Sequence, residues 1–420
     1  MTVSTTQSPA GQPTASDYNL MSAEVRADPY PYYAAMRRDS PIHQLIPGAP
    51  LFAITRYADV IHVLHHPELF SSSALQAALQ GGASGLGPNS GALAGHRLLT
   101  SPMMIATDPP DHGRLRRLVN RGFTPRRIGA LEPRIREIAN QCLDKAIQGG
   151  ELELVRGFSI PLPVTVIAEL LGVEPDRVDQ FKAWSDAFVI GLSGTTGEYT
   201  SEDVQKAADE MADYFERVAA ERRANPRNDL ISVLSQAEEG DSLSTGELLS
   251  FVALILIAGN ETTTNLIGNG VKALLAHPNQ LERVMADPTV IPALVDEVLR
   301  YDSPIQALPR SNSNAVELPS GKIPENSTLL VYYGSANRDE EQFPDAECFD
   351  IDRPAQEHVA FSHGIHYCLG ASLARLEARV AFETLFSRCR SLELAADSIP
   401  MVDSAILRGP KSVLLQVEMA

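Results

Sequence analysis

One stretch constrains this chain more than any other. It comprises residues 361–370, which read Phe-Ser-His-Gly-Ile-His-Tyr-Cys-Leu-Gly, and a helical pattern at residues 371–386 follows at once. Gly364 and Gly370 allow backbone turns that a side chain disfavours. Cys368 is therefore predicted to lie in a tight loop just before a helix N-terminus, where amide hydrogens and the positive helix end favour a thiolate. A lone thiolate held in this way is suited to ligate iron.

The pattern Phe-x-x-Gly-x-His-x-Cys-x-Gly resembles the haem-binding signature of the cytochrome P450 family in its soluble bacterial form. Ser362 stands where many members have glycine. Taken alone, the stretch also fits a buried structural cysteine in a loop. The resemblance implies haem b as the cofactor, with Cys368 as the axial ligand and Phe361, His366 and Gly370 beside the haem. In this family, thiolate ligation favours cleavage of the O–O bond.

Composition indicates one large globular domain. The chain has 420 residues, of which 44% are hydrophobic and 21% charged, and no linker rich in Pro, Gly or Ser divides its middle. The net charge of −18 argues against a nucleic-acid partner. The cysteines show neither metal-ligand spacing nor a disulfide framework, which favours a reducing cytoplasm. They are Cys142, Cys348, Cys368 and Cys389.

The N-terminal residues 1–17 are rich in Ser, Thr, Gln and Pro, so we expect a disordered tail before a domain at 18–420. The tail has neither an apolar core nor a basic start, which excludes a signal peptide or an anchor. The longest apolar run, 248–258, is too short to span a bilayer. We expect a soluble protein with no membrane partner, and a monomer by default.

A capping box, Ser244-Thr-Gly-Glu247, predicts the start of the most apolar helix, residues 248–275. Inside this helix stands Ala-Gly-Asn-Glu-Thr-Thr, residues 258–263. Polar groups in a buried helix are costly unless they are satisfied or used. A glycine can loosen the helix, and a threonine hydroxyl can bond a backbone carbonyl.

Together these residues predict a groove with a hydroxyl and a carboxylate beside it, which suits proton delivery. The motif resembles the acid–alcohol pair of the family, which maps onto Glu261 and Thr262 as catalytic residues, with Ala258 and Gly259 beside the haem. The alternative is a structural helix kink.

A second cluster of residues is cationic. At 100° per residue, His112 and Arg116 share one face of a helix that starts near residue 111, beside an apolar arc. The resemblance implies that both contact a haem propionate. It also implies that Arg310 binds the second propionate, since a guanidinium binds a carboxylate bidentately.

The pair Glu297 and Arg300 has i,i+3 spacing, which lets the two side chains meet on one helix face. The resemblance makes this pair part of a buried structural network with Arg353. A buried arginine that loses its carboxylate is strongly destabilising.

The resemblance implies a mainly α fold with a smaller β region, and a haem between the long central helix and the cysteine loop. The pattern predicts further helices at 32–38, 57–65, 133–147, 161–171, 176–192 and 201–223, strands at 51–56, 315–318 and 328–333, and a final hairpin at 405–416. Residues 71–106 and 193–200 are predicted to be mobile coverings of the substrate site. For 71–106 the alternative is a disordered insertion.

The resemblance implies hydroxylation or epoxidation of an apolar small molecule with dioxygen and two electrons. A macrolide, a terpenoid or steroid, and a fatty acid all remain open. Because aromatic residues are only 6% of the chain, we expect an aliphatic pocket. Its predicted wall is Leu254, Ile257, Ala258, Ile305, Ala307, Ile406 and Leu407, with Gln306 as a hydrogen-bonding group.

The chain contains no reductase, flavin or iron–sulfur sequence, so its electrons must come from separate proteins. We expect an acidic ferredoxin and its NAD(P)H-dependent reductase, steered by a basic patch on an acidic molecule. The predicted patch is Arg114, Arg117, Arg121, Arg375 and Arg379, and the alternative is a set of scattered solubilising charges.

Two other functions remain open. A peroxide-driven peroxygenase needs neither Glu261 nor Thr262. A non-catalytic haem protein needs no electron-transfer surface.

Overall fold

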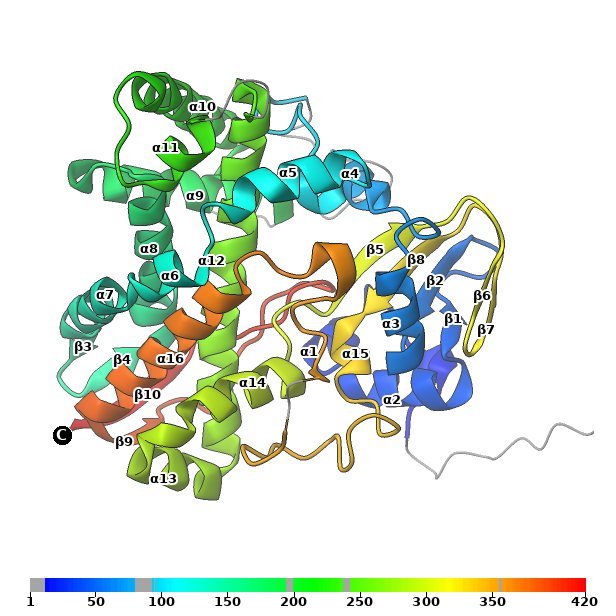
Figure 1. Cartoon of the computed structure of the whole chain (residues 1–420). Coiled ribbons are helices and arrows are strands. Elements are labelled where there is room, and N and C mark those ends of the chain that lie inside the picture. Colours follow the sequence, from blue (N-terminus) through cyan, green and yellow to red (C-terminus); the bar gives the residue numbers. More distant parts are fainter. Residues whose placement is uncertain (1–11, 80–92, 94, 194–198, 237–241, 355–356) are drawn as a thin grey trace, which may run out of the picture.

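The computed structural model describes residues 12–79, 93, 95–193, 199–236, 242–354 and 357–420. Helix α12 (Thr245–Ala276) runs through the middle of the molecule, and the other elements surround it (Figure 1). The predicted capping box is confirmed. Ser244 Oγ accepts a hydrogen bond from the Glu247 backbone N–H (3.2 Å), and the Glu247 carboxylate accepts one from the Ser244 N–H (2.8 Å). Residues 248–254, the apolar first half of the helix, are all buried.

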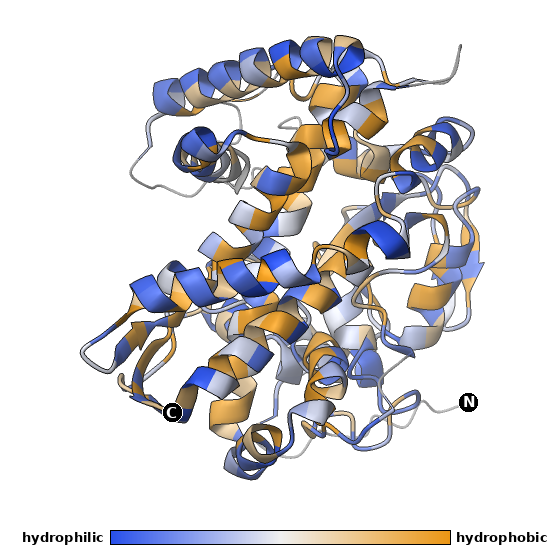
Figure 2. Ribbon diagram, turned by 60° about the vertical axis from the view of Figure 1, so that its left-hand side comes forward, coloured by the Kyte–Doolittle hydropathy of each residue, from blue (hydrophilic) through white to orange (hydrophobic). Residues whose placement is uncertain are grey.

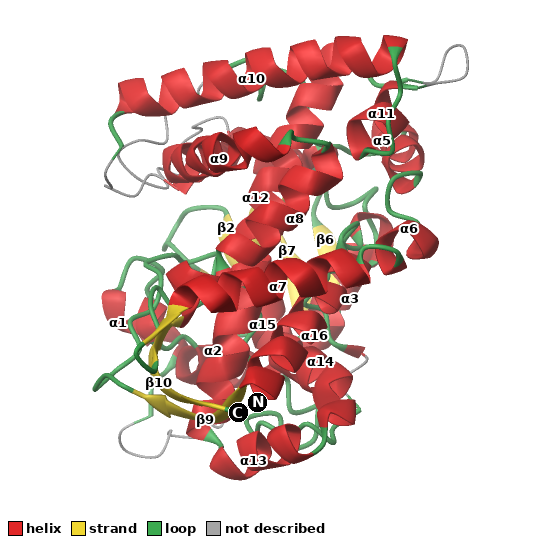
Figure 3. Cartoon of the chain, turned by 90° about the vertical axis from the view of Figure 1, so that its left-hand side faces the viewer, coloured by secondary structure: helices red, strands yellow, loops and turns green. Residues whose placement is uncertain are grey.

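Helices dominate the architecture (Figure 3). The other α-helices of the described residues are α1 (Ala23–Ala27), α2 (Tyr30–Asp39), α3 (Tyr57–His65), α4 (Ser73–Leu79), α5 (Asp111–Asn120), α6 (Pro125–Gly129), α7 (Glu132–Ala146), α8 (Pro161–Leu171), α9 (Val178–Ser193), α10 (Ser201–Ala224), α11 (Leu230–Ser235), α13 (Pro278–Ala286), α14 (Ile291–Tyr301), α15 (Tyr333–Ala336) and α16 (Ala371–Arg388). Shorter helical turns include η1 (Ala15–Asp17), η2 (Met104–Ala106) and η7 (Gly364–His366).

The strands form three small sheets. The first has the order β1-β2-β8-β5, the second β3-β4-β10-β9, and the third pairs β6 with β7. Only β2 and β8 pair in parallel among the described strands. The strands are β1 (Ile42–Gln44), β2 (Leu51–Ile54), β3 (Ile147–Gln148), β4 (Glu151–Glu153), β5 (Ala307–Ser311), β6 (Val316–Leu318), β7 (Gly321–Ile323), β8 (Thr328–Tyr332), β9 (Cys389–Leu394) and β10 (Leu414–Met419).

The main core lies where α7, α8, α14 and α16 pack around α12. Figure 2 shows hydrophobic residues where the helices meet and hydrophilic residues on their outward faces. By length and composition α12 could also cross a membrane, but 67% of its most apolar window is buried inside the protein. Burial of that kind identifies a core helix, and it surrounds the polar residues at mid-helix with apolar packing.

The N-terminal segment differs from the prediction. Residues 12–17, expected to belong to a disordered tail, include the helical turn η1. Ala15 and Tyr18 are buried, and the Tyr18 hydroxyl hydrogen-bonds that of Tyr332 on β8 (2.7 Å). Apolar contact orders this polar segment against a tyrosine cluster, which comprises Tyr18, Tyr30, Tyr33 and Tyr332. The sequence gives no local signal of this contact. Residues 1–11 lie outside the described residues.

Most predicted elements are confirmed, and their boundaries move by a few residues. The expected final hairpin at 405–416 is wrong, because β10 begins at Leu414 and pairs with β9 and β4. Residues 401–410 instead cross the central helix: a Cβ on Gly409 would lie 2.1 Å from Asn265 Oδ1 of α12. Of the predicted mobile coverings, residues 80–92, 94 and 194–198 lie outside the described residues.

The predicted ion pair on α14 is confirmed as a buried network. Both side chains of Glu297 and Arg300 have 0% exposure, and they meet through two bonds, Nη2–Oε1 at 2.7 Å and Nε–Oε2 at 2.8 Å. Arg353 Nε lies 3.6 Å from Glu297 Oε1. Arg300 also donates to the carbonyls of Ala346 (2.8 Å) and Cys348 (2.9 Å). Because breaking such a pair costs about 3–5 kcal/mol, the network fixes the loop that leads towards residues 361–370.

Candidate active site

The loop around Cys368 depends on one left-handed glycine. Gly364 has φ +66°, and a Cβ there would lie 2.4 Å from the Leu64 carbonyl oxygen. The Cys368 N–H then donates to the Phe361 carbonyl (2.9 Å), which closes the loop. Gly370 corrects the prediction, because its φ of −88° suits any residue and a Cβ there would meet no atom within 4 Å. Gly370 lies in a turn that does not require glycine, and it leaves open space beside Cys368 among the described residues.

Ser362 also has a left-handed backbone, with φ +61°. Its side chain is buried, and its Oγ has no hydrogen-bond partner among the described residues. A side chain in this conformation is strained, and an unpaired buried hydroxyl adds a desolvation cost. A serine at position 362, where the resembling family often has glycine, thus lowers the local stability of the loop.

The electrostatic surroundings of Cys368 act in two directions. Burial raises the pKa of the Cys368 thiol, while the N–H groups of Gly370 and Ala371 and the guanidinium groups of Arg116 and Arg375 lower it. Burial is the largest effect, so the helix N-terminus alone does not produce the thiolate that the sequence predicted. A metal ion bound to this thiol would supply the missing charge, because a coordinating thiol is deprotonated outright.

Helix α12 carries the second part of the site. Ala258 is exposed in the middle of this otherwise buried helix, and Glu261 and Thr262 are half-buried next to it. The Thr262 hydroxyl donates to the Ala258 carbonyl (2.6 Å), as predicted. Gly259 does not interrupt the helix. A Cβ there would lie 2.6 Å from Cδ1 of Ile167 on α8, so the glycine permits close helix packing.

Glu261 has no salt-bridge partner among the described residues. Burial raises the pKa of its carboxyl to about 7. A carboxyl group with this pKa is present in both protonation states near neutral pH, so it can both donate and accept a proton.

Two histidines meet between α5 and the cysteine loop. The ring centroids of His112 and His366 are 4.4 Å apart, and His366 Nε2 lies 2.9 Å from the Ser72 hydroxyl. His112 Nε2 is buried without a partner among the described atoms. Burial, followed by the charges of Arg310, His112 and Arg116, lowers the pKa of His366 to about 3. His366 is therefore neutral at physiological pH.

Two arginines complete this cluster. Arg116 Nη1 donates to the carbonyl of Tyr367, next to Cys368 (2.7 Å), and burial lowers its pKa. Arg310 on β5 is buried at 3% exposure and donates only to the Pro309 carbonyl among the described groups (2.8 Å). In the described part of the chain no carboxylate lies within ion-pair distance of either arginine. A buried cation, Arg310, and a half-buried one, Arg116, without a counterion among the described residues fit an anionic ligand.

Known proteins share this sequence and architecture. Residues 164–417 match the family described as Cytochrome P450. The chain is 40% identical over 390 residues to "Cytochrome P450 107B1" of Saccharopolyspora erythraea, covering 90% of this chain and 92% of that protein. It is 39% identical over 398 residues to "Vitamin D(3) 25-hydroxylase" of Pseudonocardia autotrophica, covering 93% and 94%. The structure of CYP109Q5 from Chondromyces apiculatus superposes with a TM-score of 0.86 at 40% identity, covering 97% of this chain and 100% of that one.

The chain belongs to the cytochrome P450 family. It is a cytochrome P450 monooxygenase, with a haem-thiolate cofactor. The described residues fit this cofactor. The open space at Gly370 and the exposed Ala258 suit the flat macrocycle, and the uncompensated cations suit its two propionates.

The residues predicted for the substrate wall fall into two environments. Leu254 and Ile257 lie on α12, and Ile305 forms a β-bridge with Leu407. The Gln306 N–H donates to the Ile406 carbonyl (2.6 Å), so the 401–410 segment lies beside residue 305. Residues 305, 406 and 407 thus lie side by side, and with Leu254 and Ile257 they stay candidates for the wall.

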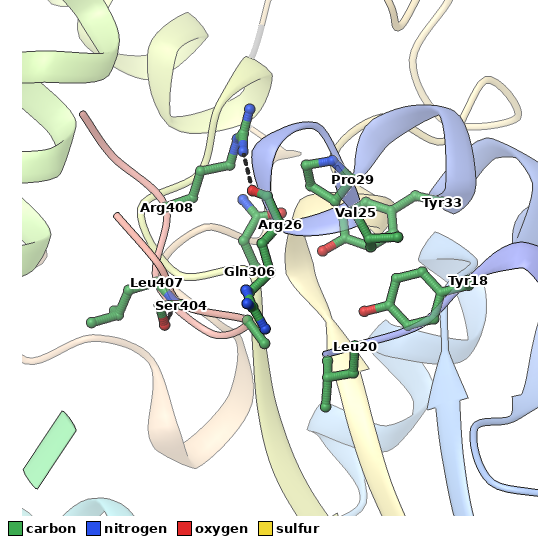
Figure 4. A pocket seen from close by; sticks show the side chains of 11 residues that line it. Tyr18, Leu20, Val25, Arg26, Pro29, Tyr33, Gln306, Ser404, Leu407 and Arg408 are labelled. Atoms are coloured by element: carbon green, nitrogen blue, oxygen red, sulfur yellow. Dashed lines mark hydrogen bonds between the residues drawn. The ribbon is translucent and has the colours of Figure 1, made fainter. Parts of the chain in front are cut away.

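Gln306 and Ala307 depart from the predicted wall. The Gln306 amide donates to the Ser303 carbonyl (2.7 Å) and the Tyr30 hydroxyl (3.4 Å). Its side chain lines a small pocket together with Tyr18 and Leu20 from the first part of the chain. The Leu407 side chain lies at the edge of the same pocket and points away from Tyr18 and Leu20 (Figure 4). Ala307 packs in the same tyrosine cluster. Both side chains are held by residues from the first part of the chain, a contact that the sequence did not predict.

One site residue, Ser72, was not predicted, and another, Arg375, was predicted only as a member of the basic patch. Ser72 reaches His366 from 294 positions away in the chain. Arg375 lies over the Phe361 ring (4.5 Å from guanidinium carbon to ring centroid) and pairs with Asp296 (2.8 Å). A serine in a Ser-rich stretch carries no signal of this contact, whereas the i+7 spacing of Arg375 from Cys368 placed it near the loop.

Strain at Ser362 gives a stability prediction. Ser362→Gly removes an αL penalty of about 1–2 kcal/mol and the unpaired hydroxyl, partly offset by about 0.4–1 kcal/mol of added unfolded-chain entropy. We expect a net gain of about 1 kcal/mol, measured as a higher midpoint of thermal haem loss and chemical unfolding.

Ser362→Ala is the matched control, because it removes the hydroxyl and keeps the backbone strain. It should gain less than Ser362→Gly. A lower midpoint for Ser362→Gly than for the wild type would contradict the strain argument.

Proposed function

We propose that this monooxygenase hydroxylates or epoxidises an apolar small molecule of the terpenoid or steroid class, using electrons from a ferredoxin. The observation that carries the proposal is the acid–alcohol pair, Glu261 and Thr262, beside the exposed Ala258 of a buried helix. A peroxygenase or a passive haem protein has no need of a proton-delivering pair at this point. We also propose a cytoplasmic location, which agrees with four free cysteines.

When bound, haem supplies an iron at which dioxygen is reduced and its O–O bond cleaved. The thiolate of Cys368 would hold the haem iron. The proposed propionate ligands are His112, Arg116, Arg310 and His366, and the proposed contacts to the macrocycle are Phe361, Gly370, Ala258 and Gly259.

Glu261 and Thr262 have different tasks in this proposal. The Thr262 hydroxyl is oriented by its bond to the Ala258 carbonyl, so its oxygen can accept and pass on a proton. Glu261, with a pKa of about 7, exchanges protons with the solvent at neutral pH. The apolar packing of α12 excludes water from the other side of the pair.

The remaining wall supports an apolar substrate without a carboxylate. Leu254, Ile257, Ile305, Ile406 and Leu407 offer aliphatic surface, and none can neutralise an acid. The cations near the site are assigned to the propionates, so a free fatty acid finds no counterion among the described wall residues. The relative named vitamin D(3) 25-hydroxylase acts on a secosteroid, by its name, which agrees with this class.

The function is tested with the holoenzyme. Supplied with NADH, a surrogate ferredoxin and reductase, and a panel of steroids, macrolides and fatty acids, the enzyme should shift its haem spectrum with a steroid or terpenoid and oxidise it. Peroxide alone should support little turnover. Efficient turnover with peroxide and none with ferredoxin would favour the peroxygenase.

The ligand assignment makes a separate prediction. The reduced, carbon-monoxide-bound protein should show the spectrum of a thiolate-ligated haem, and Cys368→Ala should abolish it. Cys142→Ala, Cys348→Ala and Cys389→Ala are matched controls and should keep it. A thiolate spectrum in Cys368→Ala would refute the assignment.

The raised pKa of Glu261 predicts how the coupling of the enzyme, the product formed per NADH consumed, depends on pH. Below about pH 7 the carboxyl is protonated and can donate, and above it the proton is lost. Product formed per NADH should therefore fall as pH rises through 7. Glu261→Gln should be poorly coupled with no inflection there, and the exposed Glu317→Gln should behave as the wild type. If the fall in product per NADH near pH 7 persisted in Glu261→Gln, another group would be responsible for it.

The predicted basic patch needs revision. Arg114 forms an ion pair with Glu247, Arg375 with Asp296, and Arg379 with Glu132 and Glu383. Because these charges are neutralised within the chain, they contribute little to steering.

Arg117, Arg126 and Arg127 form no ion pair with another described residue. They lie on α5 and α6, on the same side of the molecule as loop 361–370 (Figure 1). α6 contacts α16, and Arg116 on α5 contacts Tyr367, which is 40% exposed. We propose this surface as the ferredoxin site.

Arg117→Glu and Arg126→Glu should slow reduction by ferredoxin at low ionic strength by about tenfold, since steering of this kind is worth one to three orders of magnitude. High salt should remove the difference. Arg390→Glu, at an exposed arginine on β9, is the matched control. Equal stopped-flow reduction rates for all variants at low salt would place the docking site elsewhere.

A further inference from the structure

A short antiparallel bridge joins two residues of the proposed substrate wall. Ile305 pairs with Leu407, and the Arg408 N–H donates to the Pro304 carbonyl (2.8 Å). Because side chains alternate between the two faces of paired strands, Ile305 and Leu407 share one face and Arg408 lies on the other. Ile305 and Leu407 are half-buried, whereas Arg408 is buried at 7% exposure. The bridge therefore has a buried face at Arg408 and a more open face at the two aliphatic residues.

The Arg408 side chain is bound by residues far away in the chain. Its Nε donates to Asp302 Oδ1 (2.8 Å). Its Nη1 donates to the carbonyls of Arg26 (3.2 Å) and Ala27 (3.0 Å), the last residues of α1. Figure 4 shows the bond to Arg26 and the Leu407 side chain extending in another direction. The last carbonyls of a helix lack partners within the helix, so a cation is a favourable donor to them. We call Asp302 and these two carbonyls the Arg408 socket.

Asp302 is fixed by two further groups. Its Oδ1 also accepts a hydrogen bond from the Tyr30 hydroxyl (2.7 Å), and its Oδ2 lies 2.6 Å from Lys272 Nζ on α12. Burial raises the pKa of Asp302, but the charges of Lys272 and Arg408 outweigh this effect and hold the pKa below its usual range. Asp302 is therefore a carboxylate at physiological pH and binds two cations at once.

Asn269 on α12 binds the backbone of both partners in this pair. Its side chain is buried at 0% exposure, and its Nδ2 donates to the carbonyls of Asp302 (2.8 Å) and Arg408 (2.9 Å). One buried amide thus holds both segments of the bridge against the central helix. The side-chain bonds of Arg408 act on the same two segments, residues 302–305 and 406–408.

Loss of the Arg408 socket would move the bridge. The side chains of Arg408 and Asp302 are 8% and 2% exposed, so water screens their attraction only weakly. Without the side-chain bonds, only backbone bonds hold residue 408, and Leu407 shifts with it. Because protein interiors are close-packed, a change on the buried face of the bridge is transmitted to its open face.

We propose that Arg408 and Asp302 are positioning residues, which set how far Ile305 and Leu407 project into the substrate site and so determine the shape of the substrate that is accepted. Neither charged side chain touches the substrate, and both act through the two aliphatic residues of the bridge. Through the α1 carbonyls, the first part of the chain takes part in substrate selection. The inference rests on the proposed function only in placing Ile305 and Leu407 at the substrate wall.

The test removes one of the two cations from Asp302 at a time. Arg408→Met and Lys272→Met each leave Asp302 with one cation, but only Arg408 belongs to the bridge. Binding of clotrimazole, a bulky azole, and of imidazole, a small one, to the oxidised holoenzyme is followed by the shift in haem absorbance, which requires no turnover. In Arg408→Met the dissociation constant of clotrimazole should rise about tenfold, the effect of one lost apolar contact.

The dissociation constant of imidazole should equal the wild-type value in both variants, because imidazole is too small to contact the wall. Lys272→Met is the matched control. It should leave the clotrimazole constant unchanged as well, since Asp302 keeps its bonds to Arg408 and Tyr30.

A double-mutant cycle shows whether Arg408 acts through the wall. Leu407→Ala removes a side chain that Arg408 positions, so Arg408→Met should weaken clotrimazole binding far less in that background than in the wild type. A purely structural role of Arg408 would instead give effects that add. Arg408→Lys keeps a cation beside Asp302 and should recover part of the affinity that Arg408→Met loses.

The carbon-monoxide spectrum checks that each variant retains its haem site. If Arg408→Met does not bind haem, Arg408→Lys takes its place and should bind clotrimazole more weakly than the wild type, because an ammonium lacks the planar fork of a guanidinium. Wild-type clotrimazole affinity in the haem-loaded Arg408 variants, equal weakening in Lys272→Met, or additive effects in the cycle would overturn the inference. Failure of the steroid panel or of ferredoxin reduction would leave the azole constants unaffected and would concern only the proposed function.

Discussion

The structure depends on burying polar and ionisable groups beside one apolar helix. Around α12 and the cysteine loop lie a thiol, a carboxylic acid, two histidines and two arginines, and few of them neutralise one another. Burial raises the pKa of Cys368 and of Glu261 and lowers that of His366 and Arg116, so each group is pushed towards its neutral form. Under the proposed site assignment, an iron ion and two haem propionates would balance these groups in charge.

The ion pairs around the site differ in burial. The bidentate pair of Glu297 and Arg300 has no exposed surface, and it fixes the loop that precedes the thiolate. The pairs between Arg97 and α10 use the same chemistry on exposed side chains. Burial decides the difference, because water screens the second set and not the first.

Much of the fold was predictable because its signals are local. The capping box before α12, the apolar periodicity of α7, α8 and α10, and the i,i+3 pair on α14 depend on residues one to four positions apart. The cysteine loop was predictable for the same reason, and a ten-residue motif was enough to identify the family. Local signals failed at Gln306, at Ala307 and at the final hairpin. In each case a distant segment, either the N-terminal tyrosine cluster or β9, determined the outcome.

The sequence by itself determined the ligand loop, the acid–alcohol pair and the family, because these chemistries require particular residues at fixed short spacings. Only the tertiary structure decided which charges remain available. Arg114, Arg375 and Arg379 look like a docking patch in the sequence, yet each is neutralised by a carboxylate from another element. Arg310 and His112, on different elements, have no carboxylate partner among the described residues. Charge pairing depends on distances of a few ångströms between segments far apart in the chain, and no local pattern encodes those distances.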